Sequence, residues 1–127
     1  DGRKRCKHLY LQPLTGRDDN LPKYVCGHLC NAMSQSELSL MTLSALSNLH
    51  GACSIPKIWL EKRYGKEILD MIMRDSSDFE NVGLDALSKS RLSELINEYS
   101  VSRSMATQQV VSWLKGRYRF DPNCLTE

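Results

Sequence analysis

Polar and basic side chains near the C-terminal end of the chain follow a helical spacing. Gln108, Ser112, Lys115 and Arg119 stand at i, i+4, i+7 and i+11, so they would share one face of a helix. The apolar residues that would pack that helix on a core are Val110, Val111, Trp113 and Leu114. The polar face could then enter the major groove of DNA, where Gln reads adenine and Lys or Arg read guanine or hold phosphates.

Basic residues elsewhere could extend this contact. A cluster at the N-terminal end could hold phosphates, and one further cation precedes the expected last helix. The predicted nucleic-acid-binding residues are Arg3, Lys4, Arg5, Lys7, Arg103, Gln108, Ser112, Lys115, Arg117 and Arg119. The alternative is a solvated last helix whose cations only complement its own C-terminal dipole.

Soft metal ligands form a second group with chemical potential. Structural zinc takes four Cys or His ligands in a tetrahedron. The candidate ligands are Cys6, His8, Cys26, His28 and Cys30. Their Cys-x-His and Cys-x-His-x-Cys spacings differ from the common Cys-x₂-Cys pair. The alternative is that Cys26 and Cys30 are small buried side chains one helical turn apart, with both histidines on the surface.

Motifs of enzyme active sites do not occur in the sequence. There is no phosphate-binding loop, no HExxH and no Gly-x-Ser-x-Gly. His50 and Cys53 are close along the chain, but nucleophilic catalysis requires a defined arrangement in space. We therefore expect a protein that is not an enzyme.

The composition is that of an ordinary globular chain with an uneven distribution of charge. The 127 residues include 17 basic and 15 acidic side chains, for a net charge of +2, and the acidic ones gather in the middle. Five cysteines, an odd number, favour a reducing compartment, nuclear or cytoplasmic. No run approaches the roughly 18 apolar residues of a membrane span, so we expect no membrane partner.

Helical periodicity predicts an all-α fold, a compact bundle of four to five helices with an irregular N-terminal arm. We expect helices over residues 34 or 36 to 50, 57–74, 84–99 and 105–119, the second interrupted at Gly65 and the last stopped by Pro122. Residues 75–81 and 100–104 are expected as polar connections. The predicted divisions are an arm over 1–30 with the Cys/His residues, a helical domain over 31–122 and a tail over 123–127.

Residues 55–122 resemble the BEN domain, an all-α module of chromatin-associated and poxviral proteins. The resemblance rests on the amphipathic segment 64–73, the Leu84-Asp85 opening of the next helix, its aliphatic spacing and the basic last helix. It implies binding to DNA or chromatin, with the last helix and nearby loops at the duplex. By position, that role falls on Ser102, Arg103, Ser104, Gln108, Lys115, Arg117 and Arg119.

A second family is less similar. Residues 111–117 look like the end of a homeodomain recognition helix, but Gly116 stands where that family has its adenine-reading Asn. The sequence therefore favours a non-enzymatic DNA-binding domain of transcription, chromatin or viral genome regulation, BEN-like in its C-terminal part.

The rival hypothesis is a protein-interaction or oligomerisation module. It would use the apolar side chains Met33, Leu38, Leu40, Met41 and Leu43 if the first helix proves to be exposed. We expect this helix to belong to the core instead.

Overall fold

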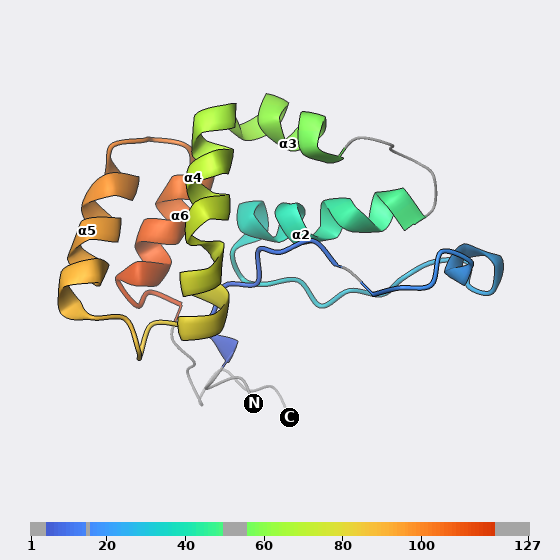
Figure 1. The fold of residues 1–127 in the computed structure, drawn as a ribbon, viewed down its shortest axis with the longest axis horizontal. Coiled ribbons are helices and arrows are strands. Elements are labelled where there is room, and N and C mark those ends of the chain that lie inside the picture. Colours follow the sequence, from blue (N-terminus) through green and yellow to red (C-terminus); the bar gives the residue numbers. More distant parts are fainter. Residues whose placement is uncertain (1–4, 15, 50–55, 119–127) are drawn as a thin grey trace. The chain divides into compact units, whose positions relative to one another are not determined.

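The computed structural model describes residues 5–14, 16–49 and 56–118, and in these residues the protein is all-α. Its α-helices are α2 (Ser36–Leu49), α3 (Pro56–Tyr64), α4 (Lys66–Ser77), α5 (Lys89–Ser100) and α6 (Met105–Leu114) (Figure 1). A 3-10 helix (Leu21–Lys23) and a π-helix (Asp78–Val82) complete the described elements. None of the helices in the described ranges has the length and apolarity needed to cross a membrane.

The chain forms two compact units. The terminal unit joins Asp1–Leu9 to Ser77–Glu127, and the central unit comprises Tyr10–Ser76. The division that the sequence predicts after residue 30 does not coincide with these boundaries. The N-terminal segment is instead shared between the units, because residues 6–9 fold with the C-terminal helices.

Backbone hydrogen bonds attach residues 6–9 to the terminal unit. The Leu9 amide donates to the Phe79 carbonyl at 3.1 Å, and the Leu84 amide donates to the Lys7 carbonyl at 2.9 Å. The Trp113 indole N–H donates to the Cys6 carbonyl at 3.0 Å, and Leu9 is fully buried. This part of the chain has no regular secondary structure, as predicted, but it is a strap that packs onto the terminal unit.

Residues 7 and 8 of the strap approach the backbone at residue 83 so closely that only glycine fits there. Gly83 ends the π-helix with φ +71°, a conformation that glycine adopts at little cost. A Cβ atom there would lie 2.5 Å from the His8 Cε1 atom and 2.9 Å from the Lys7 carbonyl oxygen. Gly83 thus allows both the turn and the close contact.

An aromatic cluster forms the core of the terminal unit. The Phe79 ring centroid lies 5.9 Å from that of Tyr99 and 5.4 Å from that of Trp113, and all three side chains are fully buried. The polar loop predicted over residues 75–81 is therefore wrong: α4 runs to Ser77 and the π-helix follows. Phe79 continues the helical spacing of Leu69 and Ile72, a signal outweighed by the polar residues around it.

Helix α5 begins five residues later than predicted. Ser88 is its N-cap, and the Ser88 hydroxyl oxygen accepts from the Arg91 amide at 3.1 Å. The Leu84-Asp85 pair, interpreted as the opening of this helix, lies in the preceding turn. Asp85 there forms an ion pair with Lys7.

Helix α2 is surrounded by other parts of the central unit, in which it packs against α3 (Figure 1). Its described side chains from Leu38 onward are buried or half-buried. The Thr42 hydroxyl donates to the Tyr10 carbonyl at 2.6 Å, and the Tyr64 hydroxyl donates to the Glu37 carbonyl at 2.9 Å. The prediction that this helix belongs to the core is confirmed for the described side chains.

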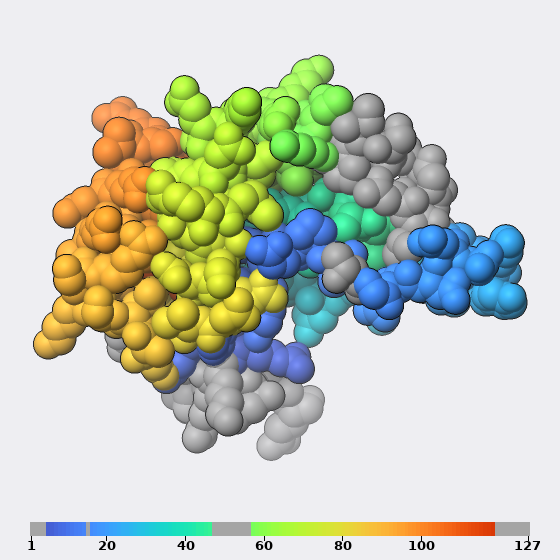
Figure 2. Space-filling view, viewed as in Figure 1, coloured from blue at the N-terminus to red at the C-terminus, as the bar shows by residue number. Residues whose placement is uncertain are grey.

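Helix α3 lies at the surface of the central unit, as its light-green atoms in Figure 2 show. It ends at Tyr64 because Gly65 adopts φ +84°, after which α4 begins. The interruption expected at Gly65 is thereby confirmed.

Candidate nucleic-acid interface

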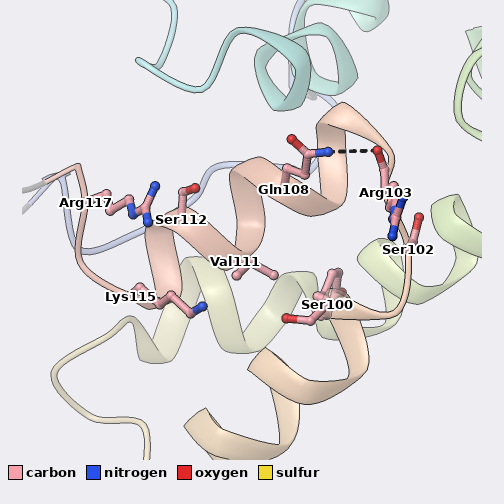
Figure 3. A pocket seen from close by; sticks show the side chains of 9 residues that line it. Ser100, Ser102, Arg103, Gln108, Val111, Ser112, Lys115 and Arg117 are labelled. Atoms are coloured by element: carbon pink, nitrogen blue, oxygen red, sulfur yellow. Dashed lines mark hydrogen bonds between the residues drawn. The ribbon is translucent and has the colours of Figure 1, made fainter.

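One pocket collects five of the predicted nucleic-acid-binding residues. It is a hollow of about 320 Å³ formed by the end of α5, the connection 101–104 and α6, all in the terminal unit. Its lining residues are Tyr99, Ser100, Ser102, Arg103, Gln108, Val111, Ser112, Lys115 and Arg117 (Figure 3). The sequence placed Arg103, Gln108, Ser112, Lys115 and Arg117 at the interface, and the fold brings them together.

Side-chain hydrogen bonds fasten the connection 101–104 onto α6. Ser104 is the N-cap, and its hydroxyl oxygen accepts from the Thr107 amide at 3.1 Å. The buried Thr107 hydroxyl donates to the Ser102 carbonyl at 3.1 Å. The Gln108 side-chain amide donates to the Arg103 carbonyl at 2.9 Å, the dashed line of Figure 3. These bonds hold the backbone that carries Arg103 in a defined position.

The C-terminal end of α6 turns back sharply. Gly116 has φ +72°, its amide donates to the Trp113 carbonyl at 2.7 Å, and the Arg117 amide donates to the Ser112 carbonyl at 3.0 Å. This is a Schellman motif, in which a left-handed glycine ends the helix. The expected helix over 105–119 is therefore wrong over residues 115–118, while residue 119 lies outside the described residues. The turn brings Arg117 to the pocket.

The charge of the pocket lining is entirely positive. Arg103, Lys115 and Arg117 are exposed, and none of the lining residues is acidic. None of these three cations forms an ion pair with a carboxylate of the described residues. In Figure 3, Arg103 and Arg117 lie at opposite ends of the pocket, and the Lys115 ammonium group points into it. Such a concave group of cations attracts anions.

Uncharged lining residues supply further hydrogen-bonding groups and one apolar surface. Ser102 and Ser112 carry hydroxyls, which can donate to phosphate oxygens, whereas the Ser100 hydroxyl already donates to the Ile96 carbonyl at 2.6 Å. Tyr99, Ser100 and Val111 line the pocket but were not among the predicted site residues. Val111 was assigned to the core, although its position three residues after Gln108 and four before Lys115 puts it on their face. Ser100 has no comparable signal, because it reaches the site from another helix.

The predicted phosphate contacts at the N-terminal end have different outcomes. Arg5 is exposed and belongs to the same unit as the pocket. Lys7 forms an ion pair with Asp85, which offsets its charge. Its role in nucleic-acid binding stays a prediction. Arg3, Lys4 and Arg119 lie outside the described residues.

The candidate zinc ligands are divided between the two units. Cys6 and His8 belong to the terminal unit, whereas Cys26, His28 and Cys30 belong to the central unit. The described residues contain no group of three or more His, Cys, Asp or Glu that could hold a metal ion. His8 Nδ1 instead lies 2.8 Å from the Glu80 carbonyl oxygen. Zinc therefore stays a prediction of the sequence, without a coordinating arrangement in the described chain.

The alternative interpretation of the cysteines is wrong. Cys26 and Cys30 are exposed, and the chain around them is not helical, so they are neither buried side chains nor one helical turn apart. Both are free thiols.

Comparison with known proteins finds no match for this chain, whether among protein-family models, curated proteins or solved structures. Functional inference therefore rests on the residues and the geometry described above.

Proposed function

We propose that this protein is a non-enzymatic DNA-binding domain of transcription, chromatin or viral genome regulation. The observation that carries the proposal is the pocket of the terminal unit, where Arg103, Lys115 and Arg117 surround one hollow without an acidic neighbour in its lining. The BEN-like character of residues 55–122 is part of the proposal and rests on the sequence alone.

The mechanism is capture of backbone phosphates. Cations that converge on a hollow suit a phosphate group, which projects from the duplex, better than base edges inside a groove. The side-chain amide of Gln108 already donates to the Arg103 carbonyl, which reduces its freedom to read adenine. Phosphate contacts set the orientation of the domain, while base reading falls to other residues of the interface.

The rival interaction module loses its principal argument. It requires an exposed apolar helix, and the described side chains of α2 from Leu38 to Leu46 are buried or half-buried. No specific observation favours the interaction module, and we therefore propose DNA rather than a protein as the partner.

The test is a binding titration with duplex DNA over a series of salt concentrations. The plot of log K against log salt has a negative slope, and each lost phosphate contact makes this slope shallower by about 0.9. The triple variant R103A/K115A/R117A should therefore bind more weakly and reduce the slope by about 2.7 if all three cations contact phosphates.

A matched control separates the pocket from net charge. Lys89 is exposed on the same unit but does not line the pocket. The single variants K89A and K115A each remove one positive charge. Because only Lys115 lines the pocket, only K115A should clearly weaken binding. Equal losses in both, or an unchanged affinity in the triple variant, would exclude the pocket as the binding site.

A further inference from the structure

Helix α3 carries an exposed face with an aromatic side chain at its centre. Ile58, Trp59, Lys62 and Arg63 stand at i, i+1, i+4 and i+5 and are all exposed, while Leu60 and Tyr64 point to the core. Trp59 is 41% exposed and Ile58 is 56% exposed. The indole of Trp59 is a large, flat and apolar surface that a planar ligand could contact.

Arg63 holds the indole ring in place from one side. The Arg63 guanidinium carbon lies 5.7 Å from the centroid of the Trp59 ring, within the range of a cation–π contact. Two hydrogen bonds to the Glu37 carboxylate, of 3.0 and 2.7 Å, fix the same guanidinium from α2. The indole is thereby supported before any ligand arrives, which lowers the entropy cost of binding to it.

The charges around Trp59 are divided between paired and unpaired ones. Arg63 forms an ion pair with Glu37, and the Lys57 Nζ atom lies 3.9 Å from the Glu61 Oε1 atom in a second ion pair. Lys62, one turn after Trp59, is exposed and is not paired with a carboxylate of the described residues. A flat aromatic surface beside a free cation complements a nucleotide, in which a planar base is joined to an anionic phosphate.

We propose that α3 is a stacking platform for an unpaired nucleobase of single-stranded nucleic acid, with the base on Trp59 and the adjacent phosphate on Lys62. Proteins that bind single strands combine aromatic side chains with cations in this way. The site belongs to the central unit and uses no residue of the pocket, so either proposal can fail without the other.

Tryptophan fluorescence provides a direct measurement. The chain has two Trp residues, and Trp113 is fully buried, so it reports little of a surface contact. Titration with a short oligothymidylate should quench the emission of Trp59, because a stacked base quenches indole. W59L should abolish this quenching and weaken the affinity about tenfold, as expected for the loss of one stacked base.

Three controls make the result specific. Y24L removes another exposed aromatic side chain of the central unit, 82% exposed in the wild type, and should leave binding unchanged. An abasic oligonucleotide of the same length keeps the phosphates but lacks bases, so it should bind wild type and W59L equally. R103A/K115A/R117A should retain the quenching, because the pocket is elsewhere in the chain.

Three results would overturn the proposal. Equal affinity of the wild type for the abasic and the normal oligonucleotide would show that no base is stacked, and wild-type affinity of W59L would show the same for this residue. A blue shift of Trp59 emission with phosphatidylserine vesicles, without any response to oligothymidylate, would reassign this face to a membrane surface. Circular dichroism establishes that W59L and Y24L are folded.

Discussion

The pocket of the terminal unit and the exposed face of α3 use the same types of cation in opposite ways. In the pocket, Arg103, Lys115 and Arg117 have no carboxylate in the lining beside them. On α3, Arg63 is held by two hydrogen bonds from its guanidinium to Glu37 and supports an aromatic ring instead. The difference shows that pairing, rather than residue type, decides whether a cation remains available to an anionic ligand.

Each arrangement also depends on a different framework. The pocket requires that α5 and α6 stay packed, which the buried aromatic cluster around Phe79 ensures. The face of α3 depends on the contacts that join α3 to α2, among them the ion pair between Arg63 and Glu37. Changes to the two frameworks should therefore have separate and unequal consequences.

The largest effect is expected from F79A, which removes the ring between Tyr99 and Trp113. Truncation of a buried Phe to Ala costs about 3–5 kcal/mol of unfolding free energy, because it leaves a cavity in the core. Urea denaturation followed by circular dichroism measures the loss. L29A is the control, since Leu29 is fully exposed and its truncation should change stability by less than about 0.5 kcal/mol. A loss as small as that of L29A would contradict the role given to the aromatic cluster.

A smaller effect is expected from S104A at the rim of the pocket. Removal of an N-cap hydroxyl costs about 1 kcal/mol, because the Thr107 amide loses its partner. The variant should also bind DNA more weakly, since the backbone that carries Arg103 is less well held. S93A, on the exposed side of α5, is the matched control and should not lower stability or change affinity, because Ala has a higher helix propensity than Ser. If S104A were destabilised but bound DNA as well as the wild type, the N-cap would contribute to stability and not to DNA binding.

The smallest effect is expected from E37Q, and it concerns pH. Hydrogen bonds from Arg63 hold the pKa of Glu37 below its usual value, partial burial opposes this, and the charge of Arg63 adds to it. A carboxylate with a lowered pKa stabilises the fold above the pKa of its unfolded form, about 4.3, and this contribution is lost as the pH falls through its folded pKa.

The measurement compares wild type and E37Q at pH 7 and pH 3. The difference between their unfolding free energies should be larger at pH 7, because Gln cannot gain or lose the proton. Trp59 emission should also become more sensitive to solvent quenchers in E37Q, since Arg63 loses one of its acceptors. A difference that does not change with pH would show that the ion pair contributes nothing to stability.

Local signals predicted several elements well. Ser36, one of the two predicted starts, is the first residue of α2, Gly65 separates α3 from α4, and Met105 begins α6 as its helical spacing indicated. The errors occurred where two local signals compete. Leu84 and Leu87 fit a helical spacing although they precede Ser88, and Gly116 was included in a helix that it ends.

The candidate pocket was only partly predictable, for a related reason. Gln108, Ser112 and Lys115 share a helix face, so their proximity follows from the 3.6-residue period. Arg103 and Arg117 join them through a capped connection and a Schellman turn, whose hydrogen bonds depend on individual backbone conformations. Ser100 comes from α5, and no local spacing predicts which residues two packed helices bring together.

The sequence alone determined the all-α character of this chain and the polar face of α6, because periodicity and glycine positions act over a few neighbouring residues. Only the tertiary structure decided which charges are compensated. Lys7 meets Asp85 across 78 positions and Arg63 meets Glu37 across 26, whereas the cations of the pocket have no acidic neighbour in its lining. Electrostatic pairing depends on distances in space, which the separation of residues along the chain does not specify.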